Sequence, residues 1–359
     1  MAKKKKTGID IKLLSEICET PGAPGFEQRI RRVVLREIGK LADQITTDNL
    51  GNVTAIRKGK ITKGKKNKKV MIAAHMDEIG FIATHIDNNG FVKFHTLGGF
   101  DPKTLTAQRV IIHGKKDVIG VMGSKPVHLM SNEERGKAVK TDDFFIDLGM
   151  GKAAVEEIVT VGDSITRERA LIEMGDCVNC KSIDNRVSVY ILIEALREMK
   201  ETNVDMYAVF TVQEEVGLRG SFASALQIQP DFGIGLDTTI AFDVPGARDH
   251  EMITKLGKGA AIKIMDASTI CDFRMVDFMK KTATKHNIQF QTEILTAGGT
   301  DTAGMQRNTA GGAIAGAISI PTRHIHQVIE TANKEDIRAC IELLKACLED
   351  MHTYDWSHN

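Results

Sequence analysis

The spacing of hydrophobic residues changes character twice along the chain, near positions 75 and 176. Before the first change, helical patterns begin near Ile9 and Phe26, on either side of the Gly- and Pro-rich run 20–25. Two apolar runs follow, at Asn52–Arg57 and Val70–Ala74, and they predict strands that pair as a hairpin. The chain is therefore expected to begin with both helices and strands.

The middle segment, from about Phe81 to Asp176, has the two-residue period of β-strands. Glycines and polar turns separate its short alternating runs at a spacing of roughly ten residues, which is typical of a small all-β unit. The runs are FIATHID, FVKFHTL, QRVIIHG, VIGVMG, FFIDLGM and DSITRER.

From Ser182 onward, helical and strand patterns alternate. The run Val187–Lys200 predicts a helix, and Met206–Val212 predicts a buried strand. Asn333 and Asp336 predict a capping box at the start of the last helix. Further strands are predicted at Phe232–Asp237, Ala260–Asp266 and Gly311–Ile320.

These patterns predict an α/β fold in which one domain is interrupted by a β insert. The first part of the α/β domain is expected at 1–75, the insert at 76–175 and the second part at 176–359. Both parts are expected to share one sheet, because the crossover lengths fit right-handed βαβ units.

Composition and charge narrow the class of protein. The chain has 359 residues, and its 48 Lys+Arg balance 47 Asp+Glu, so we do not expect a general nucleic-acid binder with a strong basic excess. No apolar run reaches the roughly 18 residues that span a bilayer, and the basic amino terminus lacks the apolar stretch of a signal peptide. The six cysteines do not suggest a disulfide framework in a chain of this length. A cytoplasmic location is therefore expected.

Three local features have more than one interpretation. The basic run Arg57–Lys69 is best explained as a solvated hairpin tip, as is Lys3–Lys6, with RNA or an acidic partner as the alternative. The Cys177–Cys180 segment favours two structural thiols over a redox pair or half a zinc knuckle. The run Gly298–Asp301 fits either a cradle for a polar end of a substrate or a tight turn.

Histidines and carboxylates gather where apolar strands end or where a helix begins. These residues are His75, Asp77, Asp184, Glu214, Glu215, Asp237 and His326. In open α/β sheets, sites form outside the carboxyl ends of strands. Neighbouring strands lie about 4.8 Å apart, so side chains from adjacent strand ends can converge.

Such a set of ligands, with no cysteine, suits Zn²⁺, Co²⁺ or Mn²⁺. Five ligands exceed the usual three of one catalytic zinc and fit two ions about 3.5–4 Å apart that share a carboxylate. A neighbouring glutamate could then accept a proton from water and pass it to a leaving amine. Each residue alone is better explained as a helix cap, a hydrogen-bonding pair or a solvated pair, so the hypothesis rests on their joint placement.

Seven segments, in order along nearly the full length, carry a resemblance to a known family. They are PGAPGFE (21–27), AAHMDEIGF (73–81), SIDNR (182–186), QEEVGLRG (213–220), LDTTIAFDVPG (236–246), GGTDTAG (298–304) and PTRHIH (321–326). With these motifs the chain resembles the glutamyl/leucyl aminopeptidases with two metal ions, also called TET aminopeptidases because they form tetrahedral particles. Some members carry the older names cellulase M or endoglucanase.

The resemblance implies a metal-dependent aminopeptidase that hydrolyses N-terminal residues from short peptides with two zinc or cobalt ions. The implied ligands are His75 and Asp237 for one ion, Glu215 and His326 for the other, and Asp184 between them. By the same resemblance, Asp77 would orient His75, and Glu214 would be the general base that later protonates the departing amine.

The resemblance also implies a zinc-peptidase-like catalytic domain with a mixed sheet, and a PDZ-like insert that forms dimers. Six dimers would close into a tetrahedral dodecamer. The chain departs from the family at Asn185, where a second aspartate is frequent, and at His324, where a tyrosine is common. It also has Gln327–Ile329 in place of the frequent Ser-Pro-Val.

Two other functions are weighed against this one. A glycoside hydrolase needs two suitably spaced carboxylates, but it would leave His75 and His326 without a role. Sugar platforms are also scarce, since aromatic residues make up 5% of the chain and Trp356 is its one tryptophan. A scaffold or RNA-binding module would use the Lys-rich segments, although the balanced net charge argues against a large basic face.

Overall fold

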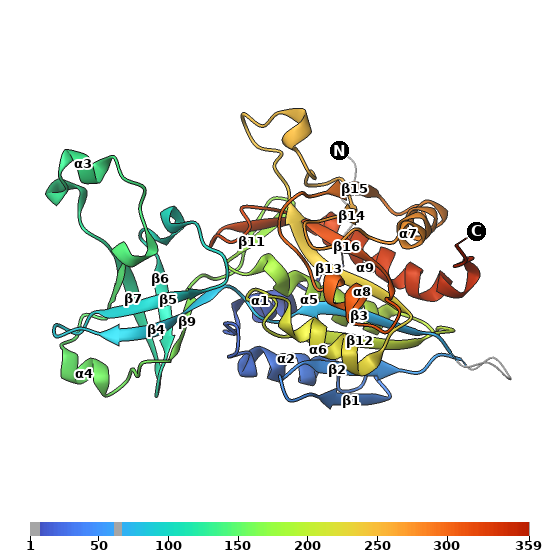
Figure 1. Cartoon of the computed structure of the whole chain (residues 1–359), viewed down its shortest axis with the longest axis horizontal. Helices are drawn as coiled ribbons and strands as arrows, with labels where there is room; N and C mark the ends of the chain where they lie inside the picture. Colours follow the sequence, from blue (N-terminus) through green and yellow to red (C-terminus); the bar gives the residue numbers. More distant parts are fainter. Residues whose placement is uncertain (1–7, 61–66, 359) are drawn as a thin grey trace.

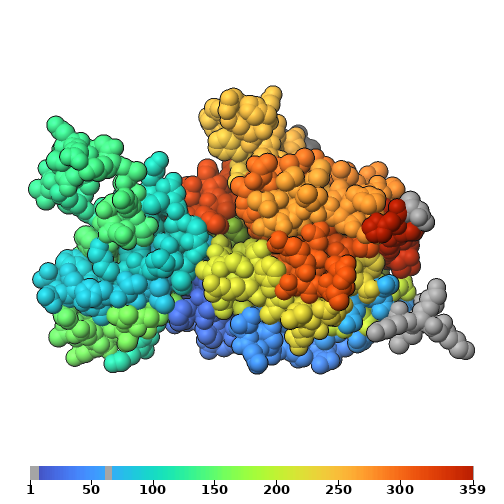
Figure 2. Space-filling view, in the orientation of Figure 1, coloured from blue at the N-terminus to red at the C-terminus, as the bar shows by residue number. Residues whose placement is uncertain are grey.

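The computed structural model describes residues 8–60 and 67–358, which form two lobes (Figure 1). The larger lobe surrounds one mixed sheet of eleven strands, and the smaller lobe contains a closed β-barrel. In the space-filling view the smaller lobe stands out to the left and touches the larger one along one side (Figure 2). No helix in the described ranges is both long and apolar enough to span a membrane.

The centre of the large sheet is parallel, in the order β12-β3-β13-β16, with antiparallel strands on both sides. Its strands are β1 (Gln44–Thr47), β2 (Val53–Arg57), β3 (Lys69–His75), β10 (Ile172–Met174), β11 (Cys177–Cys180), β12 (Asp205–Thr211), β13 (Phe232–Ile240), β14 (Ala260–Met265), β15 (Phe290–Ile294), β16 (Ile314–Arg323) and β17 (Glu330–Asn333). Strands from both sides of the predicted insert thus share one sheet, as expected.

Helices cover both faces of this sheet, because its central strands are apolar on both sides. Val70, Ile72 and Ala74 of β3 face the main core, whereas Met71 and Ala73 pack in a second cluster with α6 and α8. The main core includes residues of α1 (Ile11–Glu19), α2 (Gln28–Ile38), α5 (Ile183–Glu198), α7 (Phe273–Lys285) and α9 (Lys334–Asp350). The other cluster uses α6 (Arg219–Ile228) and α8 (Thr302–Arg307).

All six alternating runs of the middle segment become strands of the barrel, which confirms the predicted all-β unit. Its strands are β4 (Gly80–Ile86), β5 (Val92–Leu97), β6 (Arg109–His113), β7 (Asp117–Gly123), β8 (Phe145–Asp147) and β9 (Ser164–Arg167). Two short helices, α3 (Asn132–Arg135) and α4 (Lys152–Glu156), lie in its loops. Five 3₁₀ segments complete the described elements: η1 (Pro102–Leu105), η2 (Val127–Leu129), η3 (Thr141–Asp143), η4 (Asp249–Glu251) and η5 (Met351–Thr353).

The predicted hairpin of the first segment is wrong. Strands β2 and β3 are not neighbours, because β12 lies between them, antiparallel to β2 and parallel to β3. The intervening basic run is therefore not a hairpin tip, and its residues 61–66 lie outside the described part of the chain, as does Lys3–Lys6. Near the end of the predicted β unit, β10 pairs with β11 in the large sheet.

The predicted capping box is half correct. The Asn333 side chain accepts the backbone N–H of Glu335 at the start of α9. Asp336 does not return the interaction, because its carboxylate accepts the backbone N–H groups of Gly257 and Gly259, each at 2.7 Å. All six cysteines are free thiols, in agreement with the absence of a disulfide framework.

Candidate metal centre

The predicted site residues meet at the carboxyl ends of the central parallel strands. His75 ends β3, Glu214 and Glu215 follow β12, and Asp237 lies in β13, which continues to Ile240 rather than ending at the aspartate. Two more come from a helix start and a loop: Asp184 lies in the first turn of α5, and His326 lies between β16 and β17. Parallel pairing of β12, β3 and β13 brings the three strand ends to one edge of the sheet.

Asp184 stands between the two histidines. Its Oδ1 lies 3.5 Å from His75 Nε2, and its Oδ2 lies 3.5 Å from His326 Nε2. Asp237 Oδ1 is 3.7 Å from His75 Nε2, and Glu215 Oε2 is 3.4 Å from His326 Nε2. The side chains thus form two groups of potential metal ligands that share one carboxylate.

Glu214 lies at the edge of the first group. Its Oε2 is 3.8 Å from His75 Nε2, and together with Glu215 these residues form a third set with metal-ligand spacing. This position is close enough for proton transfer with a group bound at the centre, and also close enough for direct ligation. The two roles make different predictions for metal content when the carboxylate is replaced.

Asp77 connects the end of β3 to the loop after β12. Its two carboxylate oxygens accept the backbone N–H groups of Glu214 and Glu215, each at 3.1 Å. The Oδ1 atom also lies 3.5 Å from His75 Nδ1, although the nearer contact of Nδ1, at 3.1 Å, is with the main-chain oxygen of Asp77. Asp77 therefore fixes the carboxylate pair by hydrogen bonds and faces the imidazole at the same time.

Three buried carboxylates support the centre without having been predicted. Glu330 accepts the backbone N–H of Asp184 at 2.8 Å and of His326 at 2.9 Å, one with each oxygen. Glu27 accepts the backbone N–H of Gln213, just before the glutamate pair. Asp301, from the run Gly298–Asp301, accepts the hydroxyl of Thr211 at the end of β12.

The backbone is also unusual around the centre. Gln213, Leu218, His324 and His326 all have φ between 55° and 64°, in the left-handed region that non-glycine residues rarely adopt. Asp184 is joined to Asn185 by a cis peptide bond. Sparsely populated backbone conformations persist where the surrounding structure enforces them, and they cluster at functional sites.

The carboxylates around the two histidines raise the pKa values of both rings. Burial alone would lower the pKa of His75, but Glu214 and the other carboxylates around it raise that pKa well above its usual value. Burial likewise opposes protonation of His326, but the charges of Glu215 and Asp184 raise its pKa to about 10. The centre therefore attracts positive charge.

Most carboxylates of the centre also have raised pKa values. Burial raises the pKa of Glu215 to about 8 and that of Asp237 to about 6, and it raises the pKa of Glu214 well above its usual value. Asp184 is the exception, because the two histidines overcome the effect of burial and lower its pKa. Divalent cations would replace the protons that this cluster otherwise takes up.

The donor set fits such cations. It offers imidazole nitrogens and carboxylate oxygens, which suit zinc and its neighbours in the first transition series. Glu215 Oε1 is buried and has no hydrogen-bond partner among the described residues, so it has a free coordination position. A bound ion is one normal explanation for a buried polar atom that has no hydrogen-bond partner.

A cavity of about 880 Å³ opens beside the centre. The run Gly298–Thr300 lines it, as do Leu218, Phe222, Phe242 and the buried Lys263, whose ammonium is paired with Glu293 at 2.6 Å. The glycines of that run thus lie where a ligand would contact the backbone, which fits the cradle interpretation. The volume is that of a pocket for a small ligand or a peptide end.

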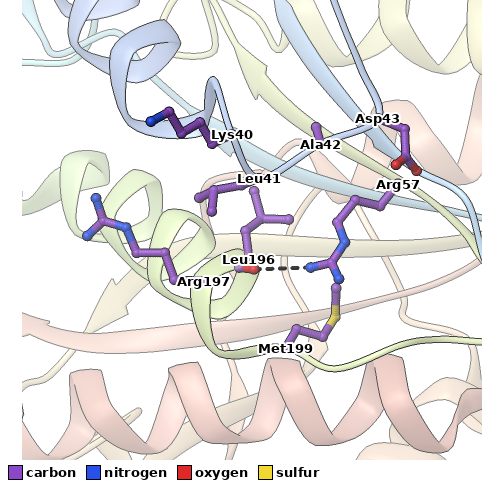
Figure 3. Close-up of a pocket in the computed structure, with 8 residues that line it drawn as sticks. All are labelled: Lys40, Leu41, Ala42, Asp43, Arg57, Leu196, Arg197 and Met199. Carbon is purple, nitrogen blue, oxygen red and sulfur yellow. Dashed lines mark hydrogen bonds between the residues drawn. The ribbon is translucent and has the colours of Figure 1, made fainter.

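A second, smaller depression of about 360 Å³ does not have this chemistry (Figure 3). Its lining residues are Lys40, Leu41, Ala42, Asp43, Arg57, Leu196, Arg197 and Met199. The Arg57 guanidinium donates a hydrogen bond to the carbonyl oxygen of Leu196 at 3.1 Å, and Asp43 accepts the backbone N–H of Lys58. With one carboxylate and no histidine in its lining, it is not a metal centre.

Comparisons with known proteins agree with this chemistry. The chain is 39% identical over 333 residues to a protein of Acetivibrio thermocellus provisionally named an aminopeptidase, covering 92% of this chain and 96% of the other. It is 34% identical over 358 residues to the lysyl aminopeptidase of Pyrococcus furiosus, covering 97% and 99%.

Solved structures extend the agreement to the fold. The aminopeptidase APDkam598 from the archaeon Desulfurococcus kamchatkensis superposes with a TM-score of 0.90 at 36% identity, covering 95% of this chain and 94% of the other. The Pyrococcus horikoshii TET1 peptidase, which can assemble into a tetrahedron or a large octahedral shell, gives 0.83 at 30% identity, covering 94% and 98%. A structure from Thermotoga maritima named endoglucanase gives 0.77 at 29%, covering 94% and 97%.

The family model of the M42 glutamyl aminopeptidases matches residues 51–343, which include all seven predicted site residues. The chain belongs to the M42 glutamyl aminopeptidase family and is a metal-dependent aminopeptidase.

Proposed function

We propose that the chain removes the N-terminal residue of short peptides with a two-ion centre and Glu214 as general base. The observation that carries this proposal is the position of Asp184, whose two oxygens each lie 3.5 Å from a different histidine. His75 and Asp237 would complete one site, and Glu215 and His326 the other. Zinc or cobalt would fit both, because the ligands are nitrogen and oxygen atoms alone.

Divalent ions bound there would polarise the scissile carbonyl and lower the pKa of a water molecule. The residues of the chain supply the remaining steps. Glu214 accepts the proton of the attacking water and returns it to the departing amine. Asp77 keeps Glu214 in place through the backbone N–H of that residue, at 3.1 Å. The adjoining cavity admits the substrate.

The proposal is tested with a panel of aminoacyl-p-nitroanilides carrying Glu, Asp, Leu, Ala, Lys or Arg. We expect cleavage that EDTA removes and that added Zn²⁺ or Co²⁺ restores. The ranking of substrates would give the preferred residue. Hydrolysis that persists after complete chelation would contradict the metal-dependent mechanism.

Metal affinity is expected to increase with pH. In the metal-free chain, Glu215 with a pKa of about 8 and His326 with a pKa of about 10 hold protons that must leave before a cation binds. Because these folded-state values are raised above the unfolded ones, their contribution to stability is present at low pH and lost as pH rises through about 8 to 10. Chelator competition at about pH 6, 7 and 8 measures the affinity, and a flat profile would contradict the expectation.

The finer features of the assembly are also proposals. We propose that the division into parts at 1–75, 76–175 and 176–359 is that of the family, with a PDZ-like insert that forms dimers. Exposed apolar residues on the barrel, Ile119 and Val121, support an interface there. A tetrahedral dodecamer is proposed from solved TET1 structures, one described as a dodecamer and one as able to form a tetrahedron. Free cysteines support a reducing, cytoplasmic location.

A glycoside hydrolase remains the second candidate because one relative of known structure is named endoglucanase. That function would leave the two histidines of the centre unexplained. Activity on a soluble glucan that survives chelation would favour it. Binding of RNA by the Lys-rich segments would be a separate property, and salt-dependent binding lost on neutralising Lys63–Lys69 would reveal it.

A further inference from the structure

The barrel lobe reaches the metal centre through the loop after β5. A Cβ atom added to Gly99 would lie 3.3 Å from Nδ1 of His326 and 3.5 Å from its Cε1. A Cβ added to Gly98 would lie 3.4 Å from Cβ of Glu215. Both contacted residues are proposed ligands of the same ion, and the loop leaves little space beside them for an added side chain.

The last strand of the barrel contributes a second contact. Arg167, at the end of β9, is 2% exposed and donates from NH2 to the carbonyl oxygen of Lys181 at 2.6 Å. Its guanidinium also lies over the ring of Phe100, 5.6 Å from the centroid. Phe100 follows Gly99 directly, so Arg167 contacts the same loop that passes His326. A buried side chain of the barrel thus packs against this loop.

Glu330, in the larger lobe, fixes the backbone at two of the ligands. Its carboxylate accepts the backbone N–H groups of Asp184 and His326 and is fully buried. The backbone of His326 is therefore held within the larger lobe, whereas its ring faces the barrel loop at Gly99.

Ion pairs also join the barrel lobe to the larger lobe. Glu78, in the segment that enters the barrel, is fully buried and pairs with Lys181 at 2.5 Å and with Arg186 at 3.5 Å. At the surface, Arg29 of α2 binds both oxygens of Asp117 in β7. These contacts join the barrel to the larger lobe.

The other ion would be independent of the barrel. His75 and Asp237 come from β3 and β13 of the large sheet, and no hydrogen bond or ion pair of the described residues joins either to a residue of strands β4–β9. The two halves of the centre therefore differ in what holds them.

We propose that the barrel is a positioning element for the ion held by Glu215 and His326, acting through Gly99 and Arg167. This inference rests on the proposed two-ion centre. It predicts that a disturbance of the barrel loop weakens one ion and leaves the other unchanged.

The test compares Gly99→Ala and Gly99→Val with Gly151→Ala in the full-length chain. Gly151 is the matched control, because it also lies in the barrel lobe, has an ordinary φ of −73°, and has no atom within 4 Å of an added Cβ. Zinc is titrated by calorimetry into EDTA-treated protein, and metal-free thermal unfolding checks the fold. We expect one of the two Kd values to rise about 10–100-fold in Gly99→Val while the other stays unchanged, with a smaller rise in Gly99→Ala and none in Gly151→Ala.

Rescue separates positioning from general damage. Arg167→Met is expected to weaken the same ion by about 10-fold and Arg167→Lys by less, because lysine keeps the charge. Arg109→Met, at a side chain that is 59% exposed, is the control. Two ions bound by Gly99→Val with wild-type affinity would overturn the positioning role. A single ion bound by the wild type would instead overturn the two-ion centre.

Discussion

Replacing Glu214 by glutamine is expected to lower kcat by about 10²–10⁴-fold while two metal ions stay bound. Glutamine has the same shape but cannot accept the proton of the attacking water. The backbone N–H of residue 214 would still bind Asp77, so the loop after β12 should keep its position. Hydrolysis of an aminoacyl-p-nitroanilide and the metal content of the same sample are measured together.

Glu342→Gln is the matched control, because Glu342 lies on α9 with a side chain that is 47% exposed. It should keep wild-type kcat and metal content. Near-normal activity of Glu214→Gln would reject the proposed base. Loss of metal together with activity would show that Glu214 is a ligand, a role that its 3.8 Å distance from His75 also allows.

Replacing Asp184 by asparagine is expected to release metal from both halves of the centre. An amide keeps one oxygen and loses the charge, so it cannot serve two cations. We expect kcat/KM to fall by at least about 10³-fold, since metal ions supply several kcal/mol of transition-state stabilisation. Metal analysis after gel filtration should give fewer than half of the wild-type ions.

The exposed Asp142 of the barrel lobe provides the control for this variant as Asp142→Asn. It should bind metal as the wild type does. An Asp184→Asn protein that retains both ions would contradict the bridging role. One that loses a single ion would show that Asp184 belongs to one site.

The hydrophobic pattern was sufficient to predict the strands but not their neighbours. All six barrel strands follow from alternation, because consecutive runs form a unit of local connections. The β2–β3 hairpin failed for the opposite reason. Strand β12, which is more than one hundred residues further along the chain, enters between them, and no local pattern reports such a long-range pairing.

The same distinction applies to the site. The seven predicted residues follow strand ends or begin a helix, and that placement is visible in the sequence. Glu27, Asp301 and Glu330 were not predicted. The sequence alone does not distinguish a buried carboxylate that accepts hydrogen bonds from a solvated one. The motifs containing them, PGAPGFE and GGTDTAG, and the glutamate four residues after His326 were the available signals.

The order of elements along the chain has a consequence for synthesis on the ribosome. The six barrel strands are contiguous in sequence, so this lobe can fold while later residues are still being added. Strand β3 obtains its two sheet neighbours only after β12 and β13 have emerged, and His326 follows β16. A nascent chain can therefore carry a folded barrel while residues of the proposed metal centre are still being made.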